Sequence, residues 1–387
     1  MRVLISGGGI AGLTLAYWLH RYGIPLVVVE QAKSIRHDGY GIDFFGTGYD
    51  VAERMGLIDR LQPQQIPIDS VMYVNKQGKQ VTKLDVTLMK KIMYGKYMAL
   101  IHWTLEEALY EALAGQVDVR FGRSLTCAVP GPDAVSVTFN DGTTESFDLL
   151  IGADGVHSRT RALVFGSEEQ FGRFLGYSIA CYQLVDHYGI DHTWKMYVEP
   201  GRLAGAYCGN HDGDIFTLFM YETAKREHLP REQRLPHLRQ MFAGMGWITQ
   251  QLLADAPVSD SIFMDAVTQI QMPSWHQGRV ALVGDACDCP TLISGQGASL
   301  AMGGAYLLAR ALHETTDYQH AFRQYEQQMR PHVQAQQKNA RGFAKSFVPG
   351  SRLGLVAQQT IMKVLLREAF IGLLRRQFGA QSILPQP

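Results

Sequence analysis

Residues 3–12 read Val-Leu-Ile-Ser-Gly-Gly-Gly-Ile-Ala-Gly, and this stretch decides the fold of the chain. Its apolar start is typical of a buried strand in a parallel sheet. The glycines that follow have the spacing Gly7, Gly9 and Gly12. The first permits a tight turn, the second lets backbone amides approach a pyrophosphate, and the third lets helix and strand pack closely. The pattern predicts a strand, a phosphate-binding turn and a helix.

The segment after the glycines completes a β-α-β unit. Residues 11–22 are expected to form a helix that ends near Gly23, and residues 25–30 a second buried strand. Glu30 closes that strand near the usual spacing of ~20 residues, where an acidic side chain accepts hydrogen bonds from ribose hydroxyls. The unit therefore predicts a dinucleotide site, and by itself it does not separate FAD from NAD.

The composition excludes several classes of protein. The 36 basic and 36 acidic residues give a formal net charge of 0, so no overall field attracts nucleic acid. No stretch reaches about 20 continuous apolar residues, so no membrane span is expected. The N-terminus lacks the features of a signal peptide. We expect a cytoplasmic protein, a monomer or a weak homodimer.

The cysteines form an odd and scattered set. Such a set fits a reducing compartment and argues against a disulfide framework. Cys287 and Cys289 form a C-x-C pair, but two further ligands at a suitable spacing are missing, so no metal site is expected. The five cysteines are Cys127, Cys181, Cys208, Cys287 and Cys289.

The middle of the chain has a different pattern. Alternating and aromatic stretches such as residues 215–221 predict a mostly antiparallel sheet. Further predicted helices are 48–61, 104–114 capped by Thr104, 231–243, 246–254, 297–313 and 317–343, the last kinked or broken at Pro331. Further predicted strands are 70–75, 79–86, 117–121, 124–129, 134–139, 143–147, 148–153 and 279–284.

Two later segments resemble the fingerprints of a known family. Residues 148–161 read Asp-Leu-Leu-Ile-Gly-Ala-Asp-Gly-Val-His-Ser-Arg-Thr-Arg, which resembles the D-G motif of the class A flavoprotein monooxygenases, the group of p-hydroxybenzoate hydroxylase. Residues 284–297 read Gly-Asp-Ala-Cys-Asp-Cys-Pro-Thr-Leu-Ile-Ser-Gly-Gln-Gly, which resembles the G-D motif of the same family. Three ordered motifs over most of the chain make the resemblance specific.

The resemblance implies one FAD per chain and an α/β fold. It implies a discontinuous Rossmann-like FAD-binding domain interleaved with a mostly antiparallel sheet domain that binds substrate. The expected FAD-binding parts are 1–70, 98–170 and 271–345, the expected substrate parts are 71–97 and 171–270, and residues 346–387 form a C-terminal helix.

The resemblance also assigns roles to single residues. Asp285 corresponds to the carboxylate on the flavin ribityl chain, and Asp154 to an aspartate that contacts FAD and NAD(P)H. Arg161 corresponds to the terminal arginine of the D-G motif, and residues 295–297 to the loop beside the isoalloxazine ring. The expected FAD-binding residues are Gly7, Gly9, Ile10, Ala11, Gly12, Glu30, His102, Asp154, Asp285, Gly295, Gln296, Gly297 and Ala298.

The family's reaction supplies the expected function. NAD(P)H transiently reduces the flavin, and a C4a-hydroperoxide then transfers one oxygen atom to an activated ring. Residues 262–289 and the terminal helix are also similar to the short tetracycline-inactivating monooxygenases. That similarity implies a polycyclic, polyketide-like substrate. Residues 352–378 carry apolar residues at helical spacing, which favours a helix packed on the body of the protein. The similarity supports the alternative that this helix is a lid over the mouth of the site, and a membrane-surface helix is a weaker alternative.

Three departures from the family fall near the reactive ring. His102 stands where the family has an arginine, Leu292 stands where it has a proline, and Cys287 and Asp288 replace its usual residues. An imidazole makes no permanent guanidinium fork, and leucine does not fix φ. Two interpretations stay open: tolerated drift in an oxygenase, or a redox-neutral FAD-binding cyclase. A flavin halogenase is disfavoured because W-x-W-x-I-P is absent.

The sequence indicates the substrate-binding residues less clearly than the FAD-binding ones. Aromatic and methionine residues of the middle sheet are candidates for the pocket, although such stripes more often form core. No catalytic His/Asp pair is identifiable, and an aromatic or polycyclic small molecule is the expected partner. The candidate substrate-binding residues are Met196, Tyr207, Phe219, Met220, Tyr221 and Leu292.

Overall fold

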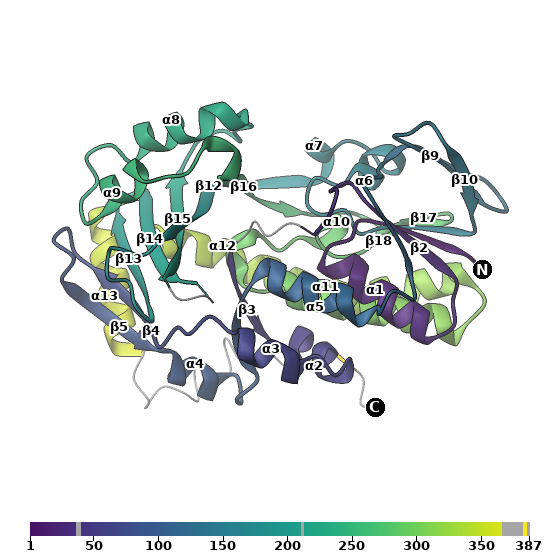
Figure 1. Ribbon diagram of the computed structural model, residues 1–387, viewed down its shortest axis with the longest axis horizontal. Coiled ribbons are helices and arrows are strands. Elements are labelled where there is room, and N and C mark those ends of the chain that lie inside the picture. Colours follow the sequence, from purple (N-terminus) through teal and green to yellow (C-terminus); the bar gives the residue numbers. More distant parts are fainter. Residues whose placement is uncertain (36–39, 210–212, 366–381, 385–387) are drawn as a thin grey trace.

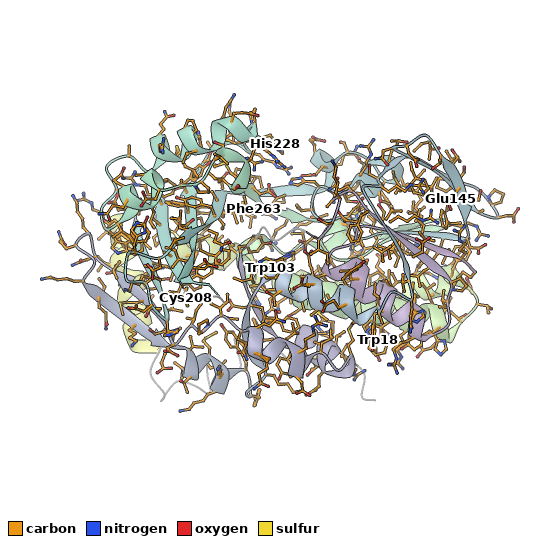
Figure 2. The ribbon with its side chains drawn as sticks, in the orientation of Figure 1. Trp18, Trp103, Glu145, Cys208, His228 and Phe263 are labelled. Atoms are coloured by element: carbon orange, nitrogen blue, oxygen red, sulfur yellow. The ribbon has the colours of Figure 1, made fainter. Side chains whose placement is uncertain are left out.

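A computed structural model describes residues 1–35, 40–209, 213–365 and 382–384 of the chain. Figure 1 shows two large sheets at opposite ends of the long axis, with helices packed along and between them. Trp18 lies in the core at one end and Cys208 in the core at the other, as Figure 2 shows. The predicted α/β fold, with one parallel and one antiparallel region, is confirmed.

The six-stranded sheet carries the glycine turn. Its strands, in spatial order, are β17 (His276–Gln277), β18 (Val280–Leu282), β11 (Leu149–Gly152), β1 (Val3–Ser6), β2 (Leu26–Glu30) and β7 (Asp118–Phe121). The pairs from β18 to β7 are parallel, and Val3 lies opposite both Leu149 and Leu26. The apolar runs predicted as buried strands therefore meet in the middle of this sheet.

Helices cover this sheet and fill the space beside it. The larger ones are α1 (Ile10–Arg21), α5 (His102–Ala112), α11 (Gly297–Glu314) and α12 (Tyr318–Phe347). A Cβ on Gly12 would stand 1.9 Å from the carbonyl oxygen of Gly7. The third glycine of the motif is therefore required by the close packing of α1 on the turn.

Two details of the helices differ from the prediction. The helix α5 begins at His102 rather than after Thr104, because β6 (Tyr97–Ile101) runs directly into it, and Thr104 is buried in its first turn. The helix α12 is not broken at Pro331. Proline in a helix interior costs about 3 kcal/mol, and the packing of the buried Met329 and Val333 on the same helix offsets that loss.

The seven-stranded sheet forms the other end of the molecule. Its strands, in spatial order, are β16 (Phe263–Ile270), β12 (Gly172–Val185), β15 (Asp214–Glu222), β14 (Arg202–Cys208), β13 (Thr193–Glu199), β4 (Ser70–Val74) and β5 (Gln80–Asp85). All neighbours are antiparallel except β13 and β4, so a hairpin from the first quarter of the chain extends the sheet made by its middle. The helices α8 (Arg231–Met241) and α9 (Thr249–Ala254) cover one face (Figure 1).

Smaller elements complete the fold. The strands β3 (Gly41–Phe45) and β6 form an antiparallel pair that the sequence patterns did not predict. A second small sheet contains β8 (Leu125–Pro130), β9 (Val135–Phe139) and β10 (Thr144–Phe147). The helix predicted at 48–61 is two helices, because Gly56 at φ +73° ends the first. The remaining elements are α2 (Thr47–Arg54), α3 (Ile58–Leu61), η1 (Gln62–Gln64), α4 (Val86–Ile92), α6 (Arg159–Val164), α7 (Glu168–Phe171), η2 (Ser259–Ser261), α10 (Asp285–Asp288) and η3 (Leu292–Ser294).

The C-terminal segment begins with α13 (Arg352–Leu365), which packs against β5 and β13. The rest of the helix predicted at 352–378 lies outside the described residues, and its lid role stays a prediction. Near the end of the chain the backbone N–H of Ile383 donates to Thr47 Oγ1 at 3.2 Å. Within the described residues, no helix is long and apolar enough to cross a membrane.

Candidate functional site

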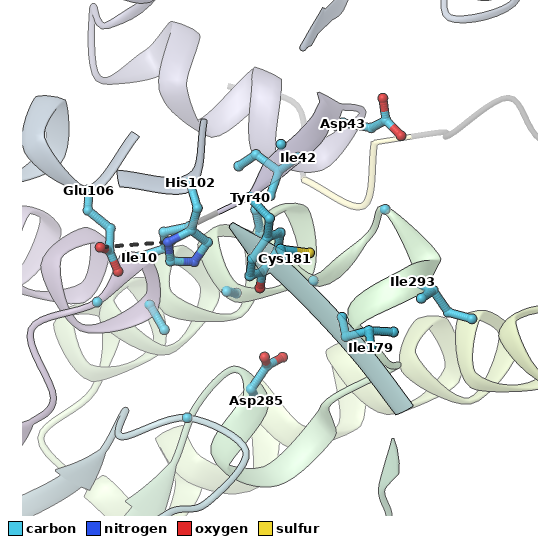
Figure 3. A pocket seen from close by; sticks show the side chains of 18 of the residues that line it. Ile10, Tyr40, Ile42, Asp43, His102, Glu106, Ile179, Cys181, Asp285 and Ile293 are labelled. Atoms are coloured by element: carbon cyan, nitrogen blue, oxygen red, sulfur yellow. Dashed lines mark ion pairs between the residues drawn. The ribbon is translucent and has the colours of Figure 1, made fainter. Parts of the chain in front are cut away.

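One long cavity joins the two regions. Its volume is about 610 Å³, and it extends from the glycine turn, past β3 and β6, to the seven-stranded sheet. Figure 3 shows its middle part, where Tyr40, His102, Cys181 and Asp285 come from four separate segments of the chain. The hydroxyl of Tyr207 on β14 accepts a hydrogen bond from the backbone N–H of Gly41 at 2.5 Å. That hydrogen bond ties the seven-stranded sheet to β3 beside the cavity.

The glycine turn forms one end of the cavity. Gly7 has φ +115°, and a Cβ there would stand 2.4 Å from the carbonyl oxygen of Ala153, so only glycine fits. The carboxylate of Glu30 accepts from the backbone N–H groups of Gly8 and Ala32, each at 2.8 Å. Because each carboxylate oxygen accepts more than one hydrogen bond, Glu30 can hold the turn and still accept from a ribose.

The D-G segment is held by its own side chains. Asp154 lines the cavity, and its Oδ2 accepts from the backbone N–H of Thr160 at 2.8 Å and from the Thr160 hydroxyl at 2.9 Å. Burial raises the pKa of Asp154, although these hydrogen bonds oppose the shift. The carboxyl group therefore fixes the loop before α6.

Arg161 does not line the cavity. Its guanidinium is fully buried and donates to the carbonyl oxygens of Ala286 at 2.8 Å and Val156 at 2.7 Å. It also lies 3.4 Å from the carboxylate of Glu168. The last residue of the D-G segment thus connects that segment to α10 in the G-D segment.

The G-D segment supplies the cavity wall beside η3 and the start of α11. Asp285 lines the cavity, and burial raises its pKa. Gly295 adopts a left-handed conformation with φ +65°, and Gly297 and Ala298 also line the cavity. Gln296 is not among the lining residues; its backbone N–H donates to Ser294 Oγ at 3.2 Å.

His102 stands at the first turn of α5 and lines the cavity. Its Nδ1 lies 3.7 Å from Glu106 Oε2, the ion pair dashed in Figure 3. Its backbone N–H donates to the carbonyl oxygen of Tyr40 at 3.0 Å. The residue that replaces the family's arginine is therefore anchored at the cavity rather than turned away from it.

The candidate substrate residues separate into two groups. Met196 and Tyr207 line the cavity. Phe219 and Tyr221 do not, because side chains alternate along β15 and these two point to the opposite face, where both contact Phe242. Met220 is fully buried in the core next to the cavity. The side chain of Leu292 lies outside the described residues.

Several lining residues were missed by the sequence patterns. Asp43 and Tyr97 lie on β3 and β6, which were not predicted, and Thr82 and Trp194 lie on β5 and β13. One signal was available: Asp43 is the only charged residue in the otherwise uncharged stretch 40–49. A carboxylate within an apolar strand has to be compensated, and often marks a site.

These features define the class of the protein. The glycine turn after β1 offers backbone N–H groups to a pyrophosphate, and a buried carboxyl group follows at Asp285. Residues 1–340 match the family described as FAD binding domain, so the chain belongs to that family. It is a flavoprotein that binds FAD.

Relatives define the activity further. The chain is 32% identical over 351 residues to a flavin-dependent monooxygenase from an unidentified prokaryotic organism, with 90% of each chain covered. It is 31% identical over 372 residues to a flavin-dependent monooxygenase from Legionella longbeachae, with 94% of each covered. The protein is an FAD-dependent monooxygenase.

Solved structures agree with this fold. The tetracycline destructase Tet(55) superposes with a TM-score of 0.85 at 28% identity, covering 99% of this chain and 98% of that one. A variant of HpxO from Klebsiella pneumoniae, complexed with FAD, superposes with a TM-score of 0.81 at 25% identity, covering 97% of each chain.

Proposed function

We propose that this monooxygenase uses NAD(P)H to reduce its FAD and inserts one atom of dioxygen into an aromatic or polyketide-like polycyclic substrate. The observation that carries the proposal is the continuous cavity. Its lining includes the glycine turn, an apolar wall on the seven-stranded sheet and the loop residue Gly295.

The residues present fit FAD. The glycine turn leaves room for a pyrophosphate where side chains would collide with the backbone, as Gly7 shows. Asp285 is a buried carboxyl group on the cavity, and a ribityl hydroxyl would supply the hydrogen bond that such a group requires. When bound, FAD supplies the redox chemistry, accepting a hydride and activating dioxygen.

The chain's own residues hold the substrate and exclude water. Apolar side chains from both regions form the wall at the sheet end, among them Ile66, Ile68, Ile179, Met196 and Leu218. An apolar wall favours a flat polycyclic molecule and keeps bulk water from the reacting atoms. The similarity to the tetracycline destructase Tet(55) supports a substrate of tetracycline-like size.

The test uses FAD-loaded protein and a panel of polycyclic phenols that includes tetracyclines. We expect at least one compound to accelerate flavin reduction by NADPH or NADH in anaerobic stopped-flow experiments, and to gain one oxygen atom when air is admitted. Heat-treated protein with added free FAD serves as the control. A flavin that neither nicotinamide reduces, with every compound of the panel present, would overturn the proposal.

A second candidate is a redox-neutral cyclase that keeps FAD as a structural group. His102 at the arginine position, paired with Glu106, favours it because the change falls beside the reactive part of the cofactor site. A product of unchanged mass, formed without NAD(P)H and without dioxygen, would support the cyclase. A product that carries an added oxygen atom would exclude it.

A further inference from the structure

Tyr40 lines the middle of the cavity, directly before β3, and its ring is held by neighbours from both regions of the fold. The ring centroid lies 5.5 Å from that of His102 on α5 and 5.3 Å from that of Phe263 on β16. The Tyr40 carbonyl oxygen also accepts the hydrogen bond from the backbone N–H of His102. Backbone and ring packing therefore fix the direction in which the Tyr40 hydroxyl points.

The hydroxyl group of Tyr40 has no hydrogen-bond partner in the part of the chain that the structure describes. It differs from buried atoms such as Thr82 Oγ1, which protein atoms enclose, because Tyr40 keeps part of its surface on the cavity. Figure 3 shows the Tyr40 side chain next to Cys181, with Asp285 across the cavity. A polar group deep in a protein is costly to leave unpaired, so this hydroxyl offers an open hydrogen-bonding position to a ligand.

The Tyr40 hydroxyl keeps its proton and acts as a hydrogen-bond donor. Burial raises the pKa of Tyr40 well above its ordinary value, and the negative charge of Asp285 raises it further. Ionisation would place a second negative charge beside Asp285 in a site with little water, so the proton stays on the oxygen. At neutral pH the cavity thus presents a donor at Tyr40.

Asp285 presents an acceptor to the same part of the cavity. Its Oδ1 lies 3.9 Å from the point where a Cβ on Gly297 would stand, at the start of α11. No hydrogen bond joins the Tyr40 hydroxyl to the Asp285 carboxyl group, so both border the space without satisfying each other. A ligand hydroxyl satisfies both groups, because it donates one hydrogen bond and accepts others. A phosphate satisfies only the donor and is repelled by a carboxylate. The chemistry that fits this pair is therefore an alcohol.

We propose that Tyr40 is a cofactor-binding residue whose hydroxyl donates a hydrogen bond to a ribityl hydroxyl of FAD, so that the ribityl chain is held between Tyr40 and Asp285. The ribityl chain is the part of FAD that carries alcohol groups next to the flavin ring. Because Tyr40 packs on both α5 and β16, this contact also ties the cofactor to the seven-stranded sheet. FAD binding belongs to the family of the chain, so the inference does not depend on the proposed reaction.

The experiment measures equilibrium binding, without NAD(P)H and without substrate. The full-length enzyme is freed of its flavin and titrated separately with FAD, with ADP, and with an FAD analogue that lacks the ribityl hydroxyls. ADP keeps the adenosine and the pyrophosphate, and the analogue keeps everything except the alcohol groups that the proposal concerns. The wild-type enzyme should bind the analogue about tenfold more weakly than FAD, or weaker still, since tenfold corresponds to one good hydrogen bond.

Tyr40→Phe removes only the hydroxyl and keeps the ring that packs on His102 and Phe263. We expect this variant to bind FAD about tenfold more weakly than the wild type. It should bind ADP and the analogue as tightly as the wild type does, because neither has a ribityl hydroxyl. The matched control is Tyr318→Phe, the same change on α12 away from the cavity lining, and it should leave every dissociation constant unchanged.

An FAD affinity of Tyr40→Phe equal to that of the wild type overturns the proposal. Equal losses for FAD and the analogue also overturn it, because they place the contact on the flavin ring. Equal losses for FAD and ADP overturn it as well, since they indicate the pyrophosphate or the fold. The wild type gives a test that needs no variant: an analogue that binds as tightly as FAD excludes the ribityl contact. An enzyme with the expected pattern whose flavin NAD(P)H never reduces would contradict only the proposed function.

Discussion

The two ends of the cavity are built in different ways. At the glycine end, the wall of the cavity is formed mainly by backbone atoms. Side chains such as Glu30 and Asp154 accept hydrogen bonds that fix the loops there. At the sheet end, side chains from strands that are distant in the sequence meet to form the wall, among them Thr82, Met196 and Leu218. The comparison shows that backbone conformation shapes the glycine end, whereas side chains brought together from distant strands shape the sheet end.

The largest expected effect concerns Arg161, which lies at the glycine end and never touches the cavity. Arg161→Met removes the donors to Ala286 and Val156 and leaves Glu168 with one partner fewer. Breaking a buried charged network destabilises by about 3–5 kcal/mol, so we expect a loss of that size in urea unfolding, together with weaker FAD retention. Stability within about 0.5 kcal/mol of the wild type, the range of a neutral surface change, would contradict this role.

The next largest expected effect tests whether the packing of α1 on the turn requires glycine at position 12. Gly12→Ala places a Cβ 1.9 Å from the Gly7 carbonyl oxygen, so α1 must move away from the turn. We expect a destabilisation of about 3 kcal/mol and a large loss of FAD affinity. The matched control is Gly342→Ala, where a Cβ meets nothing within 4 Å in α12, and which should stabilise the helix by about 1 kcal/mol. Equal behaviour of the two variants would refute the packing requirement.

The parts of the glycine end lie close together along the chain, and this explains why the sequence predicts them. The strand at 3–6, the turn and Glu30 follow one another within 30 residues, so their chemistry is visible in order. The pairing of β3 with β6 joins Gly41 to Ile101, and no local pattern reveals it. Asp43 was missed for that reason. Phe219 and Tyr221 were misplaced because alternation identifies two faces of a strand but not which face borders a cavity.

A smaller effect concerns the junction between the two ends. His157 on the D-G segment lies 3.0 Å from both Glu168 and Asp265, and these hydrogen bonds raise its pKa to about 9. A raised histidine pKa adds stability that is complete below the unfolded value near 6.5 and disappears as the pH rises through 9. Since His157 is 47% exposed, solvent screening reduces the contribution to about 1 kcal/mol.

The measurement is the unfolding free energy of wild type and His157→Gln at two pH values. We expect the wild type to be more stable by about 1 kcal/mol near pH 6 and the two proteins to converge near pH 10. Subtracting the variant removes the titration of other groups. A difference that stays constant across this range would mean that packing, and not charge, accounts for His157.

The smallest expected effect concerns the buried hydroxyl of Thr82 at the sheet end. Thr82→Val replaces a buried hydroxyl that has no partner in the described structure, so the ligand-free protein should become more stable by about 0.5 kcal/mol. Calorimetry of the ligand-free enzyme measures the change. A variant that is less stable than the wild type would show that the hydroxyl has a hydrogen-bond partner in solution.

The parallel register of β11 and β18 has a consequence for biosynthesis. Leu150 pairs with Val280, so the sheet that bears the glycine turn is completed only after more than two thirds of the chain has left the ribosome. Contacts of such long sequence separation make folding slow and leave an unpaired strand edge exposed meanwhile. The glycine turn is thus synthesised long before β18, and the edge of β11 that pairs with β18 stays unpaired during that interval.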